Sequence, residues 1–144
     1  MKVIKQISVF LENRSGALRE FTEILQAHHI SMKALCLAEI DDYGVLRIIV
    51  DDCDATAKAL TEEGFVYKLT PVLAVAIEDK PGSLVKTLEA LEAENINLEY
   101  TYAFIAREAD EAYIILRVED VDNGESALKN AGIRLLDSEE ICRL

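Results

Sequence analysis

The sequence predicts an α+β protein built from two copies of one βαββαβ unit. A six-residue segment at 13–18 returns at 79–84, each time between an apolar run and a helical pattern: Asn13-Arg14-Ser15-Gly16-Ala17-Leu18 and Asp79-Lys80-Pro81-Gly82-Ser83-Leu84. Matching residues keep a spacing of 66 positions, as in Ile48 and Ile114, which becomes 68 by Gly64 and Gly132. With right-handed crossovers, this order of elements folds into a four-stranded antiparallel sheet with both helices on one face.

The first copy is expected to span residues 1–70. Short apolar or β-branched runs indicate its strands, and three- and four-residue apolar spacing from Leu18 to His28 indicates its first helix. Asp54 is suited to cap the second helix and Gly64 to end it. We predict strands at 5–12, 32–41, 45–50 and 65–70, and helices at 15–28 and 54–63.

The second copy is expected to span residues 71–144 and to repeat the first. Leu84, Leu88 and Leu91 form the apolar stripe of its first helix, and Asp122 and Gly132 bound its second. Thr70-Pro71 is the whole junction, and Pro71 suits a strand boundary better than a central strand. We predict strands at 72–79, 97–107, 112–118 and 133–138, and helices at 81–94 and 122–131.

Composition and charge exclude several classes of protein. The 144 residues carry 27 Asp and Glu against 15 Lys and Arg, a formal net charge of -12. A nucleic-acid binder needs a basic footprint, and an anionic membrane surface would repel this chain. No apolar run approaches the length of a bilayer span, and the N-terminal residues contain no apolar signal segment. The expected location is therefore the cytoplasm.

Metal, cofactor and catalytic motifs are not apparent. The cysteines, Cys36, Cys53 and Cys142, are widely spaced, and buried reduced thiols are the simplest interpretation. His28 continues an apolar stripe and His29 stands at a helix end, where a cation is favoured. We find no nucleophile with a base and no phosphate cradle, so we expect no cofactor, no metal and no enzymatic activity.

The predicted unit is ferredoxin-like, a fold with many functions. An RNA-recognition domain would need aromatic motifs on a basic sheet, and a heavy-metal-binding domain would need a C-x-x-C loop. An acylphosphatase would use an Arg such as Arg14, but the sequence offers it no glycine-rich anion loop and no clear partner. That enzyme is kept only as a remote alternative.

The two segments 13–18 and 79–84 resemble the ACT-domain signature, N/D-x-P-G-x-L at the end of a first strand. The segments 27–31 and 94–98 look like the second landmark of that family, where the helix leads into the second strand. The resemblance covers the whole chain, twice. Ser15 stands where the family usually has Pro, and as a possible helix N-cap it leaves the fold unchanged.

The resemblance implies regulation by amino acids. ACT domains commonly pair side by side in an eight-stranded antiparallel sheet with four helices on one face, and a free amino acid often lies at the seam. Carried over to this sequence, the loop of Asn13, Arg14, Ser15, Gly16, Ala17 and Leu18 would face Asn97 and Leu98. The loop with Asp79 and Gly82 would face Ser31 and Met32.

The chemistry of these residues suits such a ligand. Gly16 and Gly82 allow close approach to the backbone, and the helix N-termini beyond them favour a carboxylate. Asn13 and Asn97 offer amides to a zwitterion, whereas the charge of Asp79 opposes a carboxylate, so we expect the Asn13–Asn97 site first.

The predicted function is a non-catalytic module that binds a free amino acid and controls a separate protein. Two copies of the chain are also expected as a candidate homodimer. The alternative is an interaction subunit of an amino-acid-metabolism enzyme without a working pocket.

Overall fold

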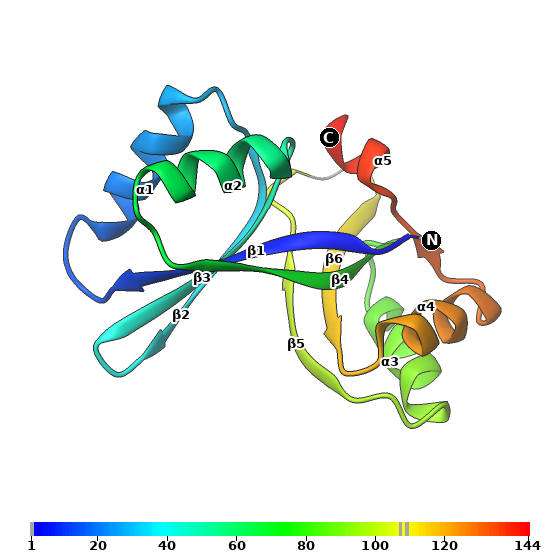
Figure 1. Cartoon of the computed structure of the whole chain (residues 1–144). Helices are drawn as coiled ribbons and strands as arrows, with labels where there is room; N and C mark the ends of the chain where they lie inside the picture. Colours follow the sequence, from blue (N-terminus) through cyan, green and yellow to red (C-terminus); the bar gives the residue numbers. More distant parts are fainter. Residues whose placement is uncertain (1, 107, 109) are drawn as a thin grey trace. The chain divides into compact units, whose positions relative to one another are not determined.

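The computed structural model describes every residue except 1, 107 and 109 (Figure 1). Its internal contacts divide the chain into two compact units, one of Lys5–Thr70 and one of Met1–Ile4 with Pro71–Leu144. Residues 107 and 109, predicted to end a strand and to lie in the following turn, are outside the described residues. The division into domains 1–70 and 71–144 stays a prediction.

The unit Lys5–Thr70 has helices over one face of an antiparallel sheet (Figure 1). The register pairs Ile7 with Ile48 and Leu35 with Ile48, so β3 lies between β1 and β2. Beyond β1, the amide of Phe10 donates to the carbonyl of Val66 just before β4 begins. Its elements are β1 (Ile4–Glu12), α1 (Ala17–Ala27), β2 (Met32–Ile40), β3 (Tyr43–Val50), α2 (Cys53–Glu62) and the start of β4 (Tyr67–Glu78).

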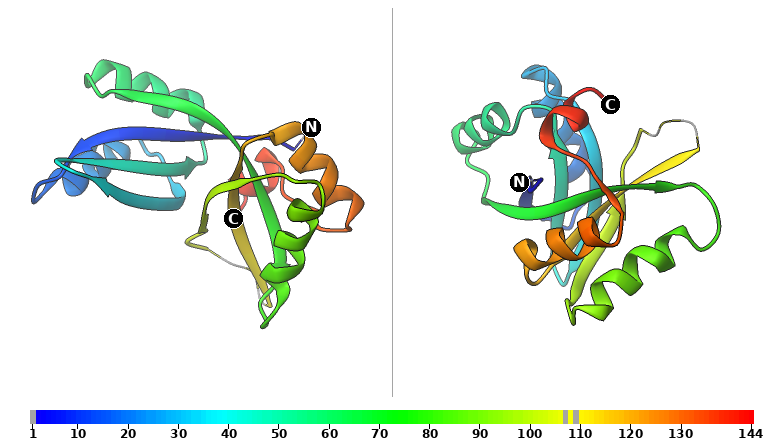
Figure 2. Two further views of the ribbon diagram at one scale, coloured as in Figure 1. Left: turned by 90° about the horizontal axis from the view of Figure 1, so that it is seen from below. Right: turned by 90° about the vertical axis from the view of Figure 1, so that its right-hand side faces the viewer.

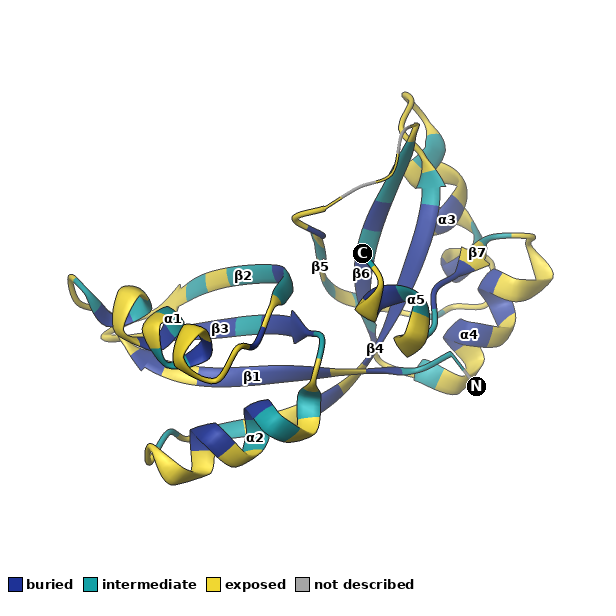
Figure 3. Cartoon of the chain, turned by 90° about the horizontal axis from the view of Figure 1, so that it is seen from above, coloured by how far each residue is buried: buried dark blue, intermediate teal, exposed yellow. Residues whose placement is uncertain are grey.

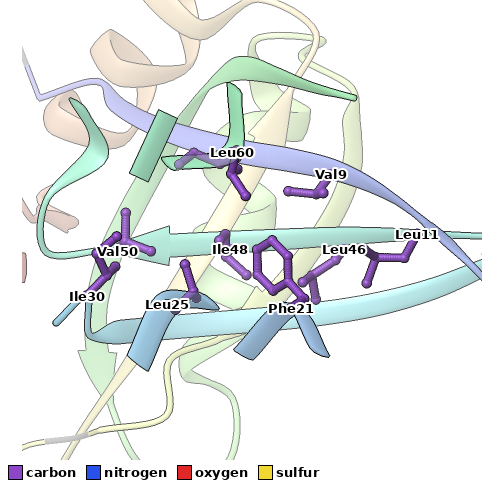
Figure 4. Close-up of a cluster of buried hydrophobic side chains, with 10 residues drawn as sticks. Val9, Leu11, Phe21, Leu25, Ile30, Leu46, Ile48, Val50 and Leu60 are labelled. Atoms are coloured by element: carbon purple, nitrogen blue, oxygen red, sulfur yellow. The ribbon is translucent and has the colours of Figure 1, made fainter. Parts of the chain in front are cut away.

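Alternation along the strands places one set of side chains against the helices (Figure 4). Phe21 and Leu25 from α1 and Leu60 from α2 meet the strands, and the Phe21 ring meets Phe65 edge to face at 5.6 Å between centroids. We call this set the first core cluster: Ile7, Val9, Leu11, Phe21, Leu25, Ile30, Leu46, Ile48, Val50 and Leu60.

The second unit repeats the arrangement. β4 pairs with β6 and, at Val75, with β7, while β5 lies on the far side of β6. Helices α3 and α4 pack against each other (Figure 2). The second core cluster is Leu73, Val75, Leu91, Leu116, Val118, Leu128 and Leu135. The remaining elements are α3 (Ser83–Ala93), β5 (Leu98–Ala103), β6 (Glu111–Val118), α4 (Val121–Asn130), β7 (Arg134–Leu135) and α5 (Ser138–Cys142).

The α+β class, antiparallel sheet and repeated order agree with the sequence prediction, but the counts do not. The predicted strands 65–70 and 72–79 form one strand, β4, because proline fits an extended backbone even though it lacks an amide hydrogen. The predicted strand 133–138 shortens to two residues, and the chain then forms α5. The described residues thus contain seven strands and five helices, not eight and four.

Helix caps correct three further predictions. Asp52, not Asp54, caps α2 by accepting from the Ala55 amide, and Asp120, not Asp122, caps α4 in the same way. Both acids lie in extended backbone before the helix, the geometry that an N-cap needs. Helix α1 begins after Gly16 without a side-chain cap, so Ser15 does not cap it.

The buried face of α3 also differs from the prediction (Figure 3). Thr87 and Leu91 are its buried residues, while Leu84, Val85 and Leu88 are 36%, 54% and 36% exposed. Leu91 of the predicted stripe is thus buried as expected, whereas Leu84 and Leu88 are not. Apolar residues surround more than one face of this helix, so spacing alone does not choose between the faces.

No helix among the described residues is both long and apolar enough to span a membrane.

Candidate functional site

The first candidate corner is the loop between β1 and α1. Gly16 has φ +89°, a left-handed conformation that glycine adopts without strain. The backbone amide of Asn13 donates to the carbonyl of Asp42 at 2.9 Å, and its side-chain amide donates to the carbonyl of Asp41 at 3.4 Å. Asn13 therefore ties this loop to the β2–β3 turn.

Arg14 lies across the first corner. Its guanidinium contacts Glu20 at 2.6 Å and Glu12 at 3.0 Å. Hydrogen bonding and charge from Arg14 lower the pKa of Glu20, and the same contacts raise the pKa of Arg14. A Cβ added to Gly16 would come within 3.7 Å of Arg19 and 3.9 Å of Arg14. The guanidinium is thus committed to two carboxylates, which also argues against its use as an acylphosphatase arginine.

A hollow of about 270 Å³ lies between this loop and residues of β2 and β3. The structure brings four of the predicted residues together there, Asn13, Arg14, Ala17 and Leu18. Its remaining walls are Leu11, Glu12, Leu37, Ala38, Glu39 and Gly44.

The second candidate corner, between β4 and α3, is more open. Gly82 has φ +90°, and a Cβ added there would meet nothing within 4 Å. A hollow of about 380 Å³ lies beside it, and Asp79 is not among its walls. The turn from α4 to β7 also lines this hollow, and its sequence pattern indicates only a helix that ends at a glycine. The lining residues are Ala76, Ile77, Glu78, Lys80, Pro81, Gly82, Ser83, Lys86, Gly132, Ile133 and Arg134.

The predicted partners from the second strands lie apart from the loop of their own unit. Asn97 and Leu98 line a hollow of about 380 Å³ with the end of α3. The amide of Ser31 donates to the Asp51 carboxylate at 3.0 Å, and Met32 packs against the first core cluster. Ser31 immediately precedes β2 and Met32 starts it, whereas the loop 13–18 lies near the far end of that strand. The facing of Asn13 with Asn97 and of Gly82 with Ser31 stays a prediction.

The burial predicted for His28 and for the three cysteines needs correction. His28 is exposed and does not continue the buried stripe of α1, and His29 has a positive φ of 55° beyond the helix end. Cys36 and Cys53 are only half-buried and Cys142 is exposed, so the thiols are not all core residues. The described residues contain no cluster of three His, Cys, Asp or Glu side chains that could hold a metal ion.

A third hollow, of about 440 Å³, lies beside α5 and is lined in part by Tyr113, Arg134 and Glu140. Arg134 joins Glu111 at 3.2 Å and Glu140 at 3.1 Å, which ties β6 and α5 to β7. Tyr113 is 4% exposed and meets Phe104 edge to face. Burial, followed by the charge of Glu111, raises the pKa of Tyr113.

Tyr113→Phe should reduce the loss of stability at alkaline pH. The folded state holds the Tyr113 proton more tightly than the unfolded state. Its contribution is therefore complete below the ordinary tyrosine pKa of about 10 and falls as pH rises through the higher folded value. Denaturant unfolding at several alkaline pH values measures the effect, with the exposed Tyr43→Phe as control. Equal alkaline slopes for both variants would contradict it.

The family model described as ACT domain pair matches residues 2–144. A crystal structure of protein BT0572 from Bacteroides thetaiotaomicron is 38% identical, with a TM-score of 0.92, 99% of this chain covered and 97% of that chain. No curated protein matches the chain.

Regulatory subunits of aspartate kinase share the fold. That of Thermus thermophilus, in a ligand-free form, is 16% identical with a TM-score of 0.67 and covers 92% of this chain and 95% of its own. The regulatory subunit from Thermus flavus is 16% identical with a TM-score of 0.56, and the match covers 92% of this chain and 97% of that chain. The ACT resemblance predicted from the two loops is confirmed, and the chain belongs to the family of proteins that carry an ACT domain pair.

Proposed function

We propose that this chain is a non-catalytic regulatory protein that binds a free amino acid or a similar small carboxylate. The observation that carries the proposal is the repeated corner. In each unit a glycine with φ near +90° precedes a helix that has no side-chain cap, at Gly16 before α1 and at Gly82 before α3. Unpaired amide hydrogens of a first helical turn attract a carboxylate, and the glycine allows it to approach.

Family membership supports a regulatory role. Two proteins of the same fold are regulatory subunits of aspartate kinase, an enzyme whose name places it in amino-acid chemistry. A small effector would act by favouring one state of the protein or of its assembly, to an extent set by its difference in affinity for the two states. The cytoplasmic location and the controlled protein remain predictions.

Titration calorimetry with each of the twenty amino acids tests this function. We expect at least one of them to bind, and Asn97→Ala to weaken it about tenfold, because a side-chain hydrogen bond to a charged group is lost. Asn130→Ala, at the exposed end of α4, is the matched control. Absence of heat with every amino acid at millimolar concentration would exclude the proposal.

A second candidate is an interaction subunit whose main role is to hold an enzyme or a second copy of this chain. The exposed apolar residues Leu84, Val85 and Leu88 on α3 favour it, since such residues are common where proteins meet. Failure of every amino acid to bind, together with co-purification of an enzyme, would select this candidate.

A further inference from the structure

The outward faces of α1 and α3 differ in chemistry, although the two helices match in length and in how they begin. Each has 11 residues and follows a glycine with a positive φ. Position for position, Val85 and Leu88 on α3 replace Arg19 and Thr22 on α1. Both apolar side chains are exposed. Because α1 forms the same helix with polar residues at these positions, the fold does not require apolar ones there.

The same exchange leaves a carboxylate of α3 without a base. On α1, the guanidinium of Arg19 binds the Glu23 carboxylate one turn further along, at 2.6 Å. The equivalent acid on α3 is Glu89, which follows the apolar residue that replaces Arg19. Glu92 in turn replaces a neutral glutamine of α1. Neither Glu89 nor Glu92 has an ion pair in the part of the chain that the structure describes.

Helical spacing places the apolar residues and the acids on one face of α3. Residues three and four apart are neighbours on a helix, so Val85 and Leu88 form one turn of this face and Glu89 and Glu92 form the next. Leu84 flanks Leu88 at four-residue spacing. We call these five exposed residues the α3 surface. Its acidic end lies toward the C-terminus of the helix, where the dipole favours a cation, yet the last turn contains no base.

We propose that the α3 surface docks an amphipathic helix of a partner protein, with apolar residues on one face and Arg or Lys beside them. The apolar face of the partner covers Leu84, Val85 and Leu88, as amphipathic helices cover complementary apolar surfaces. An Arg one turn along binds Glu89, as Arg19 binds its acid on α1.

Charge decides between the possible occupants of the α3 surface. A basic partner pairs with both carboxylates and complements the negative end of the helix. A second copy of this chain fits less well, because its own α3 surface offers acids and no base, and its formal net charge is -12. The inference deepens the proposed regulatory role, on which it rests, by naming the chemistry of the controlled partner. It uses neither glycine corner, so amino-acid binding can be measured separately.

Fluorescence anisotropy with a labelled designed peptide of leucine and arginine tests the surface on the full chain. As a helix, the peptide carries leucines on one face and arginines beside them. A scrambled peptide of the same composition lacks that face, and a third peptide has glutamate in place of arginine. We expect the amphipathic peptide to bind, the scrambled peptide to bind at least about tenfold more weakly, and the acidic peptide not to bind.

Substitutions that give α3 the residues of α1 test the surface itself. Val85→Arg together with Leu88→Thr should weaken binding at least about tenfold, because the apolar contact is lost and the new base pairs with Glu89. Glu92→Gln should weaken binding about threefold and reduce its dependence on salt. These variants should fold, since α1 carries the same residues, and circular dichroism checks this.

Matched controls lie away from α3. Val66→Arg in the first unit and Glu63→Gln at the end of α2 make the same changes at exposed positions and should leave binding unchanged. Equal binding of the scrambled peptide, no binding of the amphipathic peptide, or binding that the double variant leaves intact would overturn the inference. A dimer in sedimentation that the double variant dissociates would also overturn it, in favour of a second copy.

Amino-acid calorimetry separates the two proposals. An amino acid that binds while the amphipathic peptide does not would uphold the proposed function and overturn this inference. Peptide binding that depends on Val85 and Leu88, with no amino acid bound, would support the α3 surface and select the interaction subunit.

Discussion

Phe21→Ala should lower the free energy of unfolding of the unit Lys5–Thr70 by about 3–5 kcal/mol, the usual cost of removing a buried phenylalanine. The ring is 0% exposed and lies against the strands (Figure 4), and it meets the Phe65 ring edge to face. Alanine would leave a cavity and also remove an aromatic pair worth about 0.5–1.5 kcal/mol beyond its buried area. Urea unfolding followed by circular dichroism gives the value.

The second copy supplies a matched comparison. Thr87→Ala changes the equivalent position of α3 but removes a smaller side chain, whose hydroxyl has no hydrogen-bond partner among the described residues, so we expect a change of no more than about 1 kcal/mol. Gln26→Ala, exposed on α1, controls for the effect of alanine on that helix. Equal losses at Phe21 and Thr87 would show that the two helices pack alike, contrary to this account.

Leu128→Ala should cost the second unit about 2–5 kcal/mol. Leu128 is 0% exposed on α4 and belongs to the second core cluster with Leu73 and Val118. Close packing leaves little room for collapse there, since even a Cβ on Gly124 would come within 2.9 Å of a Val118 methyl. The surrounding side chains are therefore poorly able to fill the cavity.

Hydrogen exchange of the amides in β6 and α4 measures the effect of Leu128→Ala within its own unit. Asn130→Ala, exposed two residues further along α4, should stay within about 0.5 kcal/mol of the parent chain. A loss below about 1 kcal/mol for Leu128→Ala would mean that α4 does not depend on this side chain for its attachment to the sheet.

The repeat made most of the fold predictable. A constant spacing between matching residues aligns the two copies, so each element is predicted twice. Alternating or helical spacing of apolar residues then assigns each element as strand or helix. Every helix and strand of the first unit falls near its predicted range, apart from the strand predicted at 65–70, which begins at Tyr67 and runs on. The signal came from duplication of local patterns, which a single unit would not have provided.

Tertiary contacts decided the features that the sequence missed. The buried face of α3 contains Thr87 and Leu91 rather than Leu84 and Leu88, because packing against the sheet selects the face and residue spacing allows several. Whether a strand continues through Pro71 depends on its pairing with neighbouring strands, which the local sequence does not show. Helix α5 has too few residues for a periodic apolar pattern.

The sequence located the two candidate corners but did not predict the side-chain contacts within them. Their glycines and helix starts can be found from spacing, whereas the contacts of Arg14 with Glu12 and Glu20 depend on rotamers. Ile133 and Arg134 join the second corner only through folding, from about fifty positions away along the sequence. The sequence ranked the Asn13 corner ahead of the Gly82 corner, and this ranking stays a prediction.

Strand β4 crosses the boundary between the two sequence repeats, which matters when the gene is divided to express one copy. A cut after Thr70 would sever β4 in mid-course and would strip the second half of Lys2, whose amide binds the buried Glu125 carboxylate at 3.0 Å and whose ammonium binds the Leu135 carbonyl at 3.1 Å. Each recombinant half made at the repeat boundary would carry a truncated β4 at one end. Its unpaired strand edge should make the half tend to aggregate. A gene fragment that keeps β4 whole is the better route to studying one copy without the other.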